Sequence, residues 1–588
     1  MIAQDVYEPL SRYRDEFRGK FADAAAREFD GLTRKSGVDA EANRKLVGEI
    51  RRVADELASA KKRRAWRCFF VVVLGLAASA CIALGGMAAF GGDFNAQATA
   101  IAAGTLVGVA ALLVELAIPA YKKCAEEVRQ KETDLALKTD EAWRQLEPLN
   151  QLYEWDAVQR LIEKVVPRIK FDPYFTERRL VQLHRQFGWD DDFNNGKSVV
   201  FSQSGEINGN PFVFGDTLGM SWGSRTYTGT RTVYWTELER DSEGKLRQVT
   251  KSETLVAEVT KPCPVYSRET FLLYGNDAAP TLTFSRGPSE LSKGDGGFFA
   301  KQALKHEIKK LEKFSRNLDD ASNYTIMANR EFEALFHAVN RNDEQQFRLL
   351  FTPLAQTQML DLLRDKAVGY GDDFSFVKSR KLNLLQSAHL ANFSLDTNPE
   401  KFANYDLDTA RQNFIAFACE YFRETYFSLA PLLAIPLYQQ TRTHEDIYGL
   451  QDGESSFWEH ESIANYIGEK RFKHPESSTE NILKTRVSSR GNGFTDLSVT
   501  AYSHKTVDRV ETVRKMARNG RIYNIDVKWV EYIPVNRTSQ VRLAERNGLS
   551  LQEYRNCANS PADEWRRFFQ SLGTQPERAH YRREIITD

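Results

Sequence analysis

The sequence predicts an α+β membrane protein in which a two-helix transmembrane hairpin precedes a large cytosolic region. Cys68 to Phe90 carries no charge over 23 positions, and Ala98 to Tyr121 carries only Glu115. At about 1.5 Å per helical residue, each stretch is long enough to cross a hydrocarbon core of roughly 30 Å. Downstream, residues 197–284 hold short runs rich in Val, Thr and aromatic residues between turn residues, a pattern typical of antiparallel strands.

The charges beside the two apolar stretches predict their orientation. Basic residues lie before the first stretch and after the second, whereas the connector 91–95 has none; they are Lys61, Lys62, Arg63, Arg64, Arg67, Lys122, Lys123 and Arg129. Cationic flanks stay on the cytoplasmic side of a membrane. We therefore expect a membrane protein with two spans and both termini in the cytosol. The first stretch begins too late, and is too long, for a cleaved signal peptide.

Composition narrows the expected partners and cofactors. The 588 residues include 80 basic and 80 acidic ones, so no overall charge favours nucleic acid, and we do not expect it as a partner. The six cysteines are scattered and form no Cys-x-x-Cys pair. Neither a disulfide framework nor a zinc site is indicated. We expect no cofactor.

Two long helices should flank the membrane. Leu46, Ile50, Val53 and Leu57 recur at the spacing of one helix face, which predicts a helix from about Asp39 into the first span. Residues 125–170 contain no glycine and are rich in Glu, Lys, Leu and Gln, which predicts a second helix, interrupted near position 148. The two helices could pair as a stalk, or each could pack on the soluble region.

The region after residue 197 should form an antiparallel β domain of five to seven strands. An Asn208-Gly209 dipeptide suits a tight hairpin turn, and Asp241 to Gly244 marks another. Helical periodicity returns at Phe298 to Leu318. The expected strands cover Ser198–Ser202, Pro211–Gly215, Thr226–Trp235, Lys245–Val259, Thr270–Tyr274 and Thr281–Phe284.

The C-terminal part should contain a small β meander and two closing helices. An Asn519-Gly520 turn separates Val507–Arg518 from Arg521–Val535, and Leu497–Tyr502 supplies a third strand. Caps at Ser550 and Ser560 predict the helices. The predicted segments are 1–67 (cytosolic helix), 68–121 (hairpin, spans 68–90 and 98–121), 122–196 (juxtamembrane helices), 197–297 (β-rich domain), 298–437 (mixed α/β) and 438–588 (C-terminal extension).

The stretch Glu331 to Leu395 carries a family resemblance. Together with Gly205 to Phe212, Phe332, Phe336 and Phe351-Thr352-Pro353, it resembles DUF3137, a bacterial family of membrane-anchored proteins catalogued as a domain of unknown function. The resemblance covers about residues 98–395 and implies two neighbouring spans in a bacterial cytoplasmic (inner) membrane, followed by a β-rich cytoplasmic domain. This chain departs from it in a longer β section and a long C-terminal extension. The family implies no activity, so no catalytic residue is carried over.

Four polar clusters invite a metal-site interpretation. Tyr370-Gly371-Asp372-Asp373 could hold two cations, but we favour a plain turn because a four-residue match is unspecific. His444-Glu445-Asp446 and Glu459-His460-Glu461 lack a second histidine at helical spacing, so we expect exposed polar residues. Asp190-Asp191-Asp192 lacks the spaced acceptors of a calcium loop.

Small residues and one acid stand out within the spans. Gly75 with Ser79 and Gly104 with Gly108 form small-x-x-x-small faces that allow close helix approach, either within the hairpin or in a homo-oligomer. Glu115 is costly in lipid, and we favour snorkelling or helix pairing over ion conduction for it.

Two further segments could touch a membrane surface. Leu429 to Leu437 is too short and too rich in proline to span, so a buried core segment is favoured over interfacial insertion. The segment from Lys484 to Arg521 contains nine basic residues and three acidic ones. Anionic lipid could be contacted by four of the basic residues, Arg514, Lys515, Arg518 and Arg521. A solvated sheet face gives the same pattern.

We therefore predict a membrane-anchored binding or scaffolding protein whose ligand and protein partner are unidentified. The anchor is well defined and no known catalytic motif is present, so an enzyme is the less favoured class. Its best candidate residues would be His337, Asp372 and Asp373. A second alternative is an oligomeric pore built from the hairpin, with Glu115 as its distinctive residue.

Overall fold

The computed structural model describes ten stretches of the chain, which divide into two compact units. One, the helical unit, comprises Ala26–Tyr153 and Asn398–Ala416, and the other, the mixed unit, comprises Met1–Ala25, Glu154–Thr397 and Phe417–Asp588. Helices α2 (Arg18–Ser36) and α13 (Leu407–Leu433) run through the boundaries. The described residues are 7–90, 96–190, 196–240, 246–292, 298–316, 324–441, 454–491, 494–545, 580–582 and 584–587.

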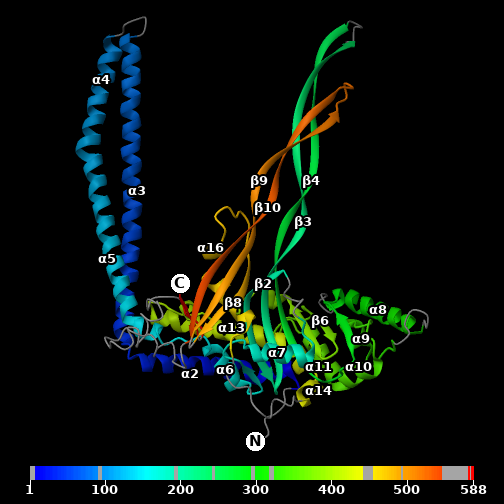
Figure 1. Ribbon diagram of the computed structural model, residues 1–588. Coiled ribbons are helices and arrows are strands. Elements are labelled where there is room, and N and C mark those ends of the chain that lie inside the picture. Colours follow the sequence, from blue (N-terminus) through cyan, green and yellow to red (C-terminus); the bar gives the residue numbers. More distant parts are fainter. Residues whose placement is uncertain are drawn as a thin grey trace. The chain divides into compact units, whose positions relative to one another are not determined.

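The helical unit is built on two long helices that run side by side (Figure 1). They are α3 (Ala40–Phe90) and α5 (Ile118–Asn150), with α4 (Ala96–Ala111) and the π-helical η2 (Leu112–Ala117) before α5. Asp39 caps α3, because its carboxylate accepts hydrogen bonds from the backbone N–H groups of Glu41 and Ala42 at 2.9 and 3.0 Å. The expected helix from about Asp39 into the first apolar stretch is confirmed.

The segments of α3 and α5 outside the apolar stretches pair as a stalk. Leu46 and Ile50 pack with Ala142, and Leu57 and Ala60 pack with Val128. Four ion pairs lie along the contact between the two helices. Because their side chains are largely exposed, they fix the register of the two helices more than they stabilise the pairing. They are Glu49–Lys138, Glu56–Lys131, Lys61–Glu132 and Arg63–Glu127, at 2.6 to 2.8 Å. Pairing, rather than separate packing on the soluble region, is what the structure shows.

Two helices, Ala40–Leu84 and Ala103–Asn150, are long and apolar enough to cross a membrane, and their apolar windows are not buried in protein. The predicted interruption of the second helix near Pro148 is confirmed. Helix α5 ends at Asn150, two residues after Pro148, and a separate helix α6 (Ala157–Val165) follows. Proline cannot donate to the preceding turn, so it favours a helix end here. The last predicted helical residues, Ile169 and Lys170, lie instead in strand β1 (Ile169–Phe171).

The mixed unit contains a seven-stranded antiparallel sheet of order β1-β2-β3-β4-β7-β6-β5. Asn208 and Gly209 have positive φ angles of 52° and 83°, which confirms the predicted hairpin turn between β2 and β3. Strands β6 and β7 join the same sheet from beyond residue 297. The strands are β2 (Lys197–Ile207), β3 (Asn210–Arg240), β4 (Leu246–Gly275), β5 (Thr283–Arg286), β6 (Phe374–Ser379) and β7 (Leu382–Ser387).

Strands β3 and β4 are far longer than predicted, because four expected strands are fused into two. Pairing continues through Gly219 to Ser224, which look like a break in the sequence. Pro262 and Pro264 also lie inside β4. Proline is tolerated where its missing N–H would face an open strand edge. Because backbone N–H directions alternate along a strand, the nitrogens of these two prolines point to the same edge.

A second, five-stranded antiparallel sheet has the order β11-β12-β10-β9-β8. Gly520, with φ of 75°, confirms the predicted turn between β9 and β10. The expected strands Leu497–Tyr502 and Val507–Arg518 belong to one strand, β9, which ends at Met516, and the third strand of the meander is β8. The strands are β8 (Ile482–Gly491), β9 (Phe494–Met516), β10 (Ile522–Glu545), β11 (His580–Tyr581) and β12 (Glu584–Thr587).

The two long hairpins leave their sheets together as a twisted arm (Figure 1). We define the arm as residues 220–240 and 246–271 of β3–β4 and residues 503–535 of β9–β10. A thin apolar seam joins the hairpins, and Gly229 allows it, because a Cβ there would lie 2.6 Å from the carbonyl oxygen of Asp526. The seam contains Val233, Leu255, Ala257, Val259, Ala517, Ile525 and Val527.

Helices cover the sheets and complete the core. The predicted helix at Phe298–Leu318 is confirmed as α8 (Phe298–Arg316). Of the segment Leu429 to Leu437, residues up to Ile435 are buried as predicted, and the last two are half-buried. The other helical elements are α1 (Pro9–Arg12), η1 (Tyr13–Phe17), α7 (Glu177–Phe187), η4 (Glu290–Ser292), α9 (Arg330–Phe336), α10 (Glu344–Leu350), α11 (Pro353–Arg364), α12 (Ala388–Ala391), η5 (Pro399–Lys401), α14 (Pro436–Gln440), α15 (Phe457–Ile467) and α16 (Glu469–Phe472).

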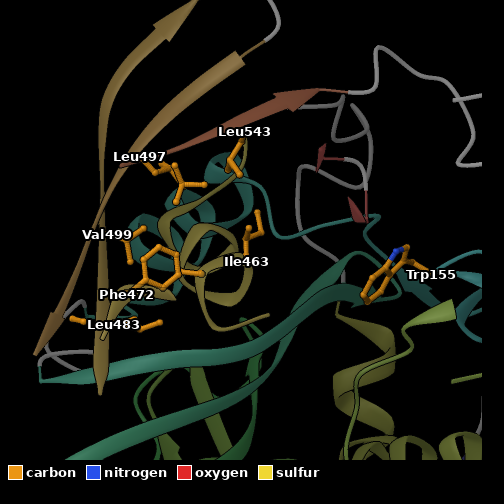
Figure 2. Packing of buried hydrophobic residues seen from close by; sticks show 10 residues of the cluster. Trp155, Ile463, Phe472, Leu483, Leu497, Val499 and Leu543 are labelled. Carbon is orange, nitrogen blue, oxygen red and sulfur yellow. The ribbon is translucent and has the colours of Figure 1, made fainter. Parts of the chain in front are cut away.

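Helices α15 and α16 pack beneath the five-stranded sheet (Figure 2). Ile463 and Phe472 from the helices meet Leu483, Val499 and Leu543 from the strands, and all five are buried. This cluster anchors the base of the β9–β10 hairpin in the mixed unit.

Candidate functional sites

The far end of the β9–β10 hairpin gathers basic residues around one turn. From Arg514 to Ile522 the sequence holds four basic residues and no acidic one. The structure exposes all four at the end of the hairpin, Arg514, Lys515, Arg518 and Arg521. Arg518 lies 3.7 Å from Glu253 on β4, whereas the other three form no ion pair with any residue in the described ranges.

Two apolar side chains share this turn, and the sequence analysis missed them. Met516 and Ile522 lie opposite each other in the β9–β10 register and are 69% and 65% exposed. Side chains alternate along a strand, so this pair and Arg514 share the face turned away from the seam, whereas Ile525 points into it. On the neighbouring hairpin Tyr234, Leu238 and Leu246 are also exposed.

The apolar hairpin turns its small residues away from the other described helices. A Cβ placed on Gly75, Gly104 or Gly108 would meet nothing within 4 Å. The hydroxyl of Ser79 donates to the carbonyl of Gly75 at 2.9 Å. Glu115 lies in η2 and is exposed. The glycines therefore do not form the contact within the hairpin, and a role in oligomer packing stays a prediction.

Asp372, one of the candidate metal ligands, is paired with a buried arginine. Its carboxylate lies 2.7 Å from the guanidinium of Arg286, and both side chains are almost fully buried. The backbone N–H of Ser289 and the hydroxyl of Ser292 also donate to it, at 2.8 and 2.7 Å. A guanidinium thus occupies the place that a cation would take. Burial lowers the pKa of Arg286, although Asp372 opposes this effect.

Asp373 belongs to a network that the sequence did not reveal. Phe374 pairs with Ser387, so β6 and β7 bring Asp373 beside His389, and Asp373 Oδ2 lies 2.5 Å from His389 Nδ1. His389 Nε2 lies 3.0 Å from the Oγ of Ser428 on α13. This order of groups resembles a Ser-His-Asp triad.

The network nevertheless lacks the geometry of a nucleophilic site. The Ser428 hydroxyl donates to the carbonyl of Glu424 at 2.8 Å, and the residue is 1% exposed within the last turns of α13. A nucleophile needs its proton directed at the base and an open approach for substrate. Tyr370 covers the imidazole, with 4.0 Å between ring centroids, and its hydroxyl donates to Glu424. The arrangement fastens α13 to the β6–β7 hairpin.

His337, the third candidate catalytic residue, joins neither aspartate. It caps α9 in a left-handed conformation with φ of 53°, and its Nε2 lies 3.5 Å from Glu307 on α8. Within the stretches that the structure describes, no group of three or more His, Cys, Asp and Glu side chains could hold a metal ion.

Glu459, His460 and Glu461 are buried, so the expectation of exposed residues is wrong. Helix α15 packs against β2 and β8, which removes all three side chains from water. Glu459 pairs with Arg582 at 2.7 Å, and Glu461 pairs with Lys484 at 2.7 Å. Burial lowers the pKa of His460 to about 4. Each of the two buried acids forms an ion pair with a cation, which offsets the cost of removing its charge from water.

A cavity of about 350 Å³ lies between the seven-stranded sheet and the loop after α12. Asp216 and Thr270 line it from the strands, and Ser394 from the loop. Asp216 Oδ1 is buried without a hydrogen-bond partner, Oδ2 lies 3.8 Å from Arg268, and burial raises the pKa of this carboxyl. Val200 and Phe201, at the β-bulge of the adjacent strand, also line the cavity. No sequence motif marks these residues.

Some predicted features lie outside the described residues. They are His444-Glu445-Asp446, Asp191-Asp192, the Asp241 to Gly244 turn, and the two closing helices with caps at Ser550 and Ser560.

Comparison with known proteins adds no relative. No protein family, curated protein or solved structure matches this chain.

Proposed function

We propose that this chain is a binding or scaffolding protein of the bacterial cytoplasmic membrane, with two spans, both termini in the cytosol, and the arm as its binding element. The basic flanks of the spans support this orientation, and the resemblance to DUF3137 supports the anchored plan. The polar clusters with catalytic residue types are instead engaged in internal pairs.

The observation that carries the proposal is the exposure of the arm. Beyond Gly219, β3 has no described strand partner except β4, and β4 has none except β3 before Leu272. Open strand edges and exposed apolar side chains are features that binding surfaces use. A chain that only needed a stable core would gain nothing from two hairpins that leave the core.

Topology labelling tests the orientation. A cysteine placed at Asn95 should react with a membrane-impermeant reagent in intact cells, whereas Cys263 and Cys557 should react only after lysis. This follows because only the connector should lie outside, given its lack of basic residues. Labelling of Cys263 or Cys557 from outside would invert the proposed topology.

Shortening the arm tests its binding role. Deleting residues 227–259, with an Asn-Gly turn joining the paired Thr226 and Thr260, removes the far half of one hairpin without disturbing the sheet register. Partners captured from solubilised membranes should be lost while membrane level stays unchanged. The control variant, Leu349→Ser with Leu354→Ser, removes exposed apolar surface elsewhere and should keep them. An identical captured set with the short arm would contradict the role.

A membrane-bound enzyme or receptor for a small molecule is the second candidate, because Asp216, whose Oδ1 has no hydrogen-bond partner, lines a cavity of ligand size. Asp216→Asn keeps the shape and removes the charge. A lost cellular phenotype, with unchanged folding and with the short-arm variant still active, would favour this candidate over the arm.

A further inference from the structure

We propose that the tip of the β9–β10 hairpin docks on a membrane surface rich in anionic lipid headgroups. By the tip we mean Arg514 to Ile522, the turn of this hairpin with its flanking residues. The inference rests on the proposed function and names one surface of the arm together with its ligand.

Charge complementarity is the first support. The four cations of the tip stand within nine residues that contain no acid, and all are exposed. Three of them form no ion pair with a residue that the structure describes, so their charge is not neutralised within the fold. Clusters of four to eight Lys and Arg residues are the usual signature of binding to anionic headgroups.

The apolar pair is the second support. Met516 and Ile522 face each other across the strands, beside Arg514, on the surface turned away from the seam. A cross-strand pair of this kind gains nothing from water, and basic residues flanking an apolar patch are typical of shallow insertion at the boundary of headgroups and acyl chains. The pattern is short and lies at the turn of the β9–β10 hairpin.

The aromatic content of the tip argues for lipid over nucleic acid. Single-stranded nucleic acids are bound by stacking bases on exposed aromatic rings. The nearest aromatic residue, Tyr523, is already engaged: the Arg231 guanidinium lies 5.7 Å from its ring centroid, and Asn519 donates to its hydroxyl at 2.9 Å. The exposed apolar residues of the tip are aliphatic.

The β9–β10 hairpin carries the tip well away from its own sheet. It extends beyond its pairing with β8 by the 14 residues from Ile522 to Val535, about 45 Å at 3.3 Å per residue.

Hydrogen–deuterium exchange of the full chain in lipid nanodiscs tests the proposal. Exchange at residues 510–526 should be at least about tenfold slower in phosphatidylglycerol discs than in phosphatidylcholine discs, since each cation near an anionic surface contributes roughly a fivefold factor. Raising the salt concentration to about 0.5 M should remove the difference because of screening.

Two matched variants separate the tip from the rest of the sheet. Replacing Arg514, Lys515, Arg518 and Arg521 by Gln should abolish the lipid dependence. The control replaces Arg486, Arg490, Lys505 and Arg509 by Gln, which removes the same charge nearer the base of the hairpin, and should keep it.

Equal exchange in both lipids, or protection that survives the tip variant, would overturn the docking proposal. Protection that appears only when an RNA oligonucleotide is added to neutral discs would also overturn it and assign the cations to nucleic acid. The proposed function fails separately, through the topology labelling or the short-arm variant. A chain with the expected topology and no lipid-dependent exchange would keep its binding arm and lose this inference.

Discussion

His460 shows how one buried side chain can link stability to pH. It lies on α15, is 3% exposed, and has a pKa of about 4 because burial disfavours the imidazolium. In the unfolded chain the pKa is about 6.5. Below pH 6.5 the imidazole is therefore protonated in the unfolded state while it is still neutral in the folded state, which favours unfolding. Stability from this group is therefore complete above pH 6.5 and is lost as pH falls toward 4.

The predicted loss for His460 is about 3 kcal/mol across that window, from about 1.4 kcal/mol per pH unit of difference between the two pKa values. Unfolding of the detergent-solubilised chain in urea at pH 7 and pH 5 measures most of it. His460→Gln should flatten the pH dependence relative to wild type. Glu459 acts in the opposite direction, because burial raises its pKa. A wild-type curve no steeper than that of His460→Gln would contradict the assignment.

Single residues also show which contacts could not be predicted from the sequence. The acids at positions 459 and 461 look solvated because they flank a histidine in a polar run, and their cations, Arg582 and Lys484, are distant in sequence. Asp373 and His389 meet only because of the β6–β7 register. Local sequence predicts local chemistry, and these pairs depend on tertiary contacts.

At the scale of elements, turns were predictable and strand lengths were not. Asn208-Gly209 and Asn519-Gly520 were located from the left-handed conformations that these residues tolerate. The runs around Gly219 to Ser224, and Pro262 with Pro264, look like strand ends. They are not, because in a two-stranded ribbon one edge of each strand is free, and residues that would break a central strand are accepted there.

The seam of the arm gives a prediction for one glycine. In Gly229→Ala the new methyl group would meet the carbonyl oxygen of Asp526, which is rigid backbone, so the hairpins should separate locally at a cost of about 1 to 3 kcal/mol. Faster amide exchange in 523–527 would report this. Gly219→Ala on the same strand is the control, because its nearest neighbour is the flexible Lys197 side chain at 3.5 Å. Unchanged exchange in Gly229→Ala would mean that the seam is looser than described.

At the scale of the whole molecule, the two apolar helices lead to a prediction about assembly. Gly104 and Gly108 lie about one turn apart on α4 and share one face, and Glu115 follows them in the π-helical η2. The contact between Cys81 Sγ and Thr105 Oγ1, at 3.6 Å, lies on another side of α4. A Cβ on either glycine would meet nothing within 4 Å, and in lipid such a face allows close packing against a second helix.

We expect the full chain in mild detergent to be a homo-oligomer held through this glycine face. Helix association in lipid depends on close packing, so Gly104→Leu with Gly108→Leu should shift the chain to monomer in light-scattering measurements. Ala103→Leu, an equally exposed position about a quarter turn away, should leave the assembly intact. If the wild-type chain is monomeric, the predicted self-association is wrong, and so is the interpretation of Glu115 as a pore residue. An oligomer that survives the double glycine variant would place the interface elsewhere and leave the open glycines to lipid.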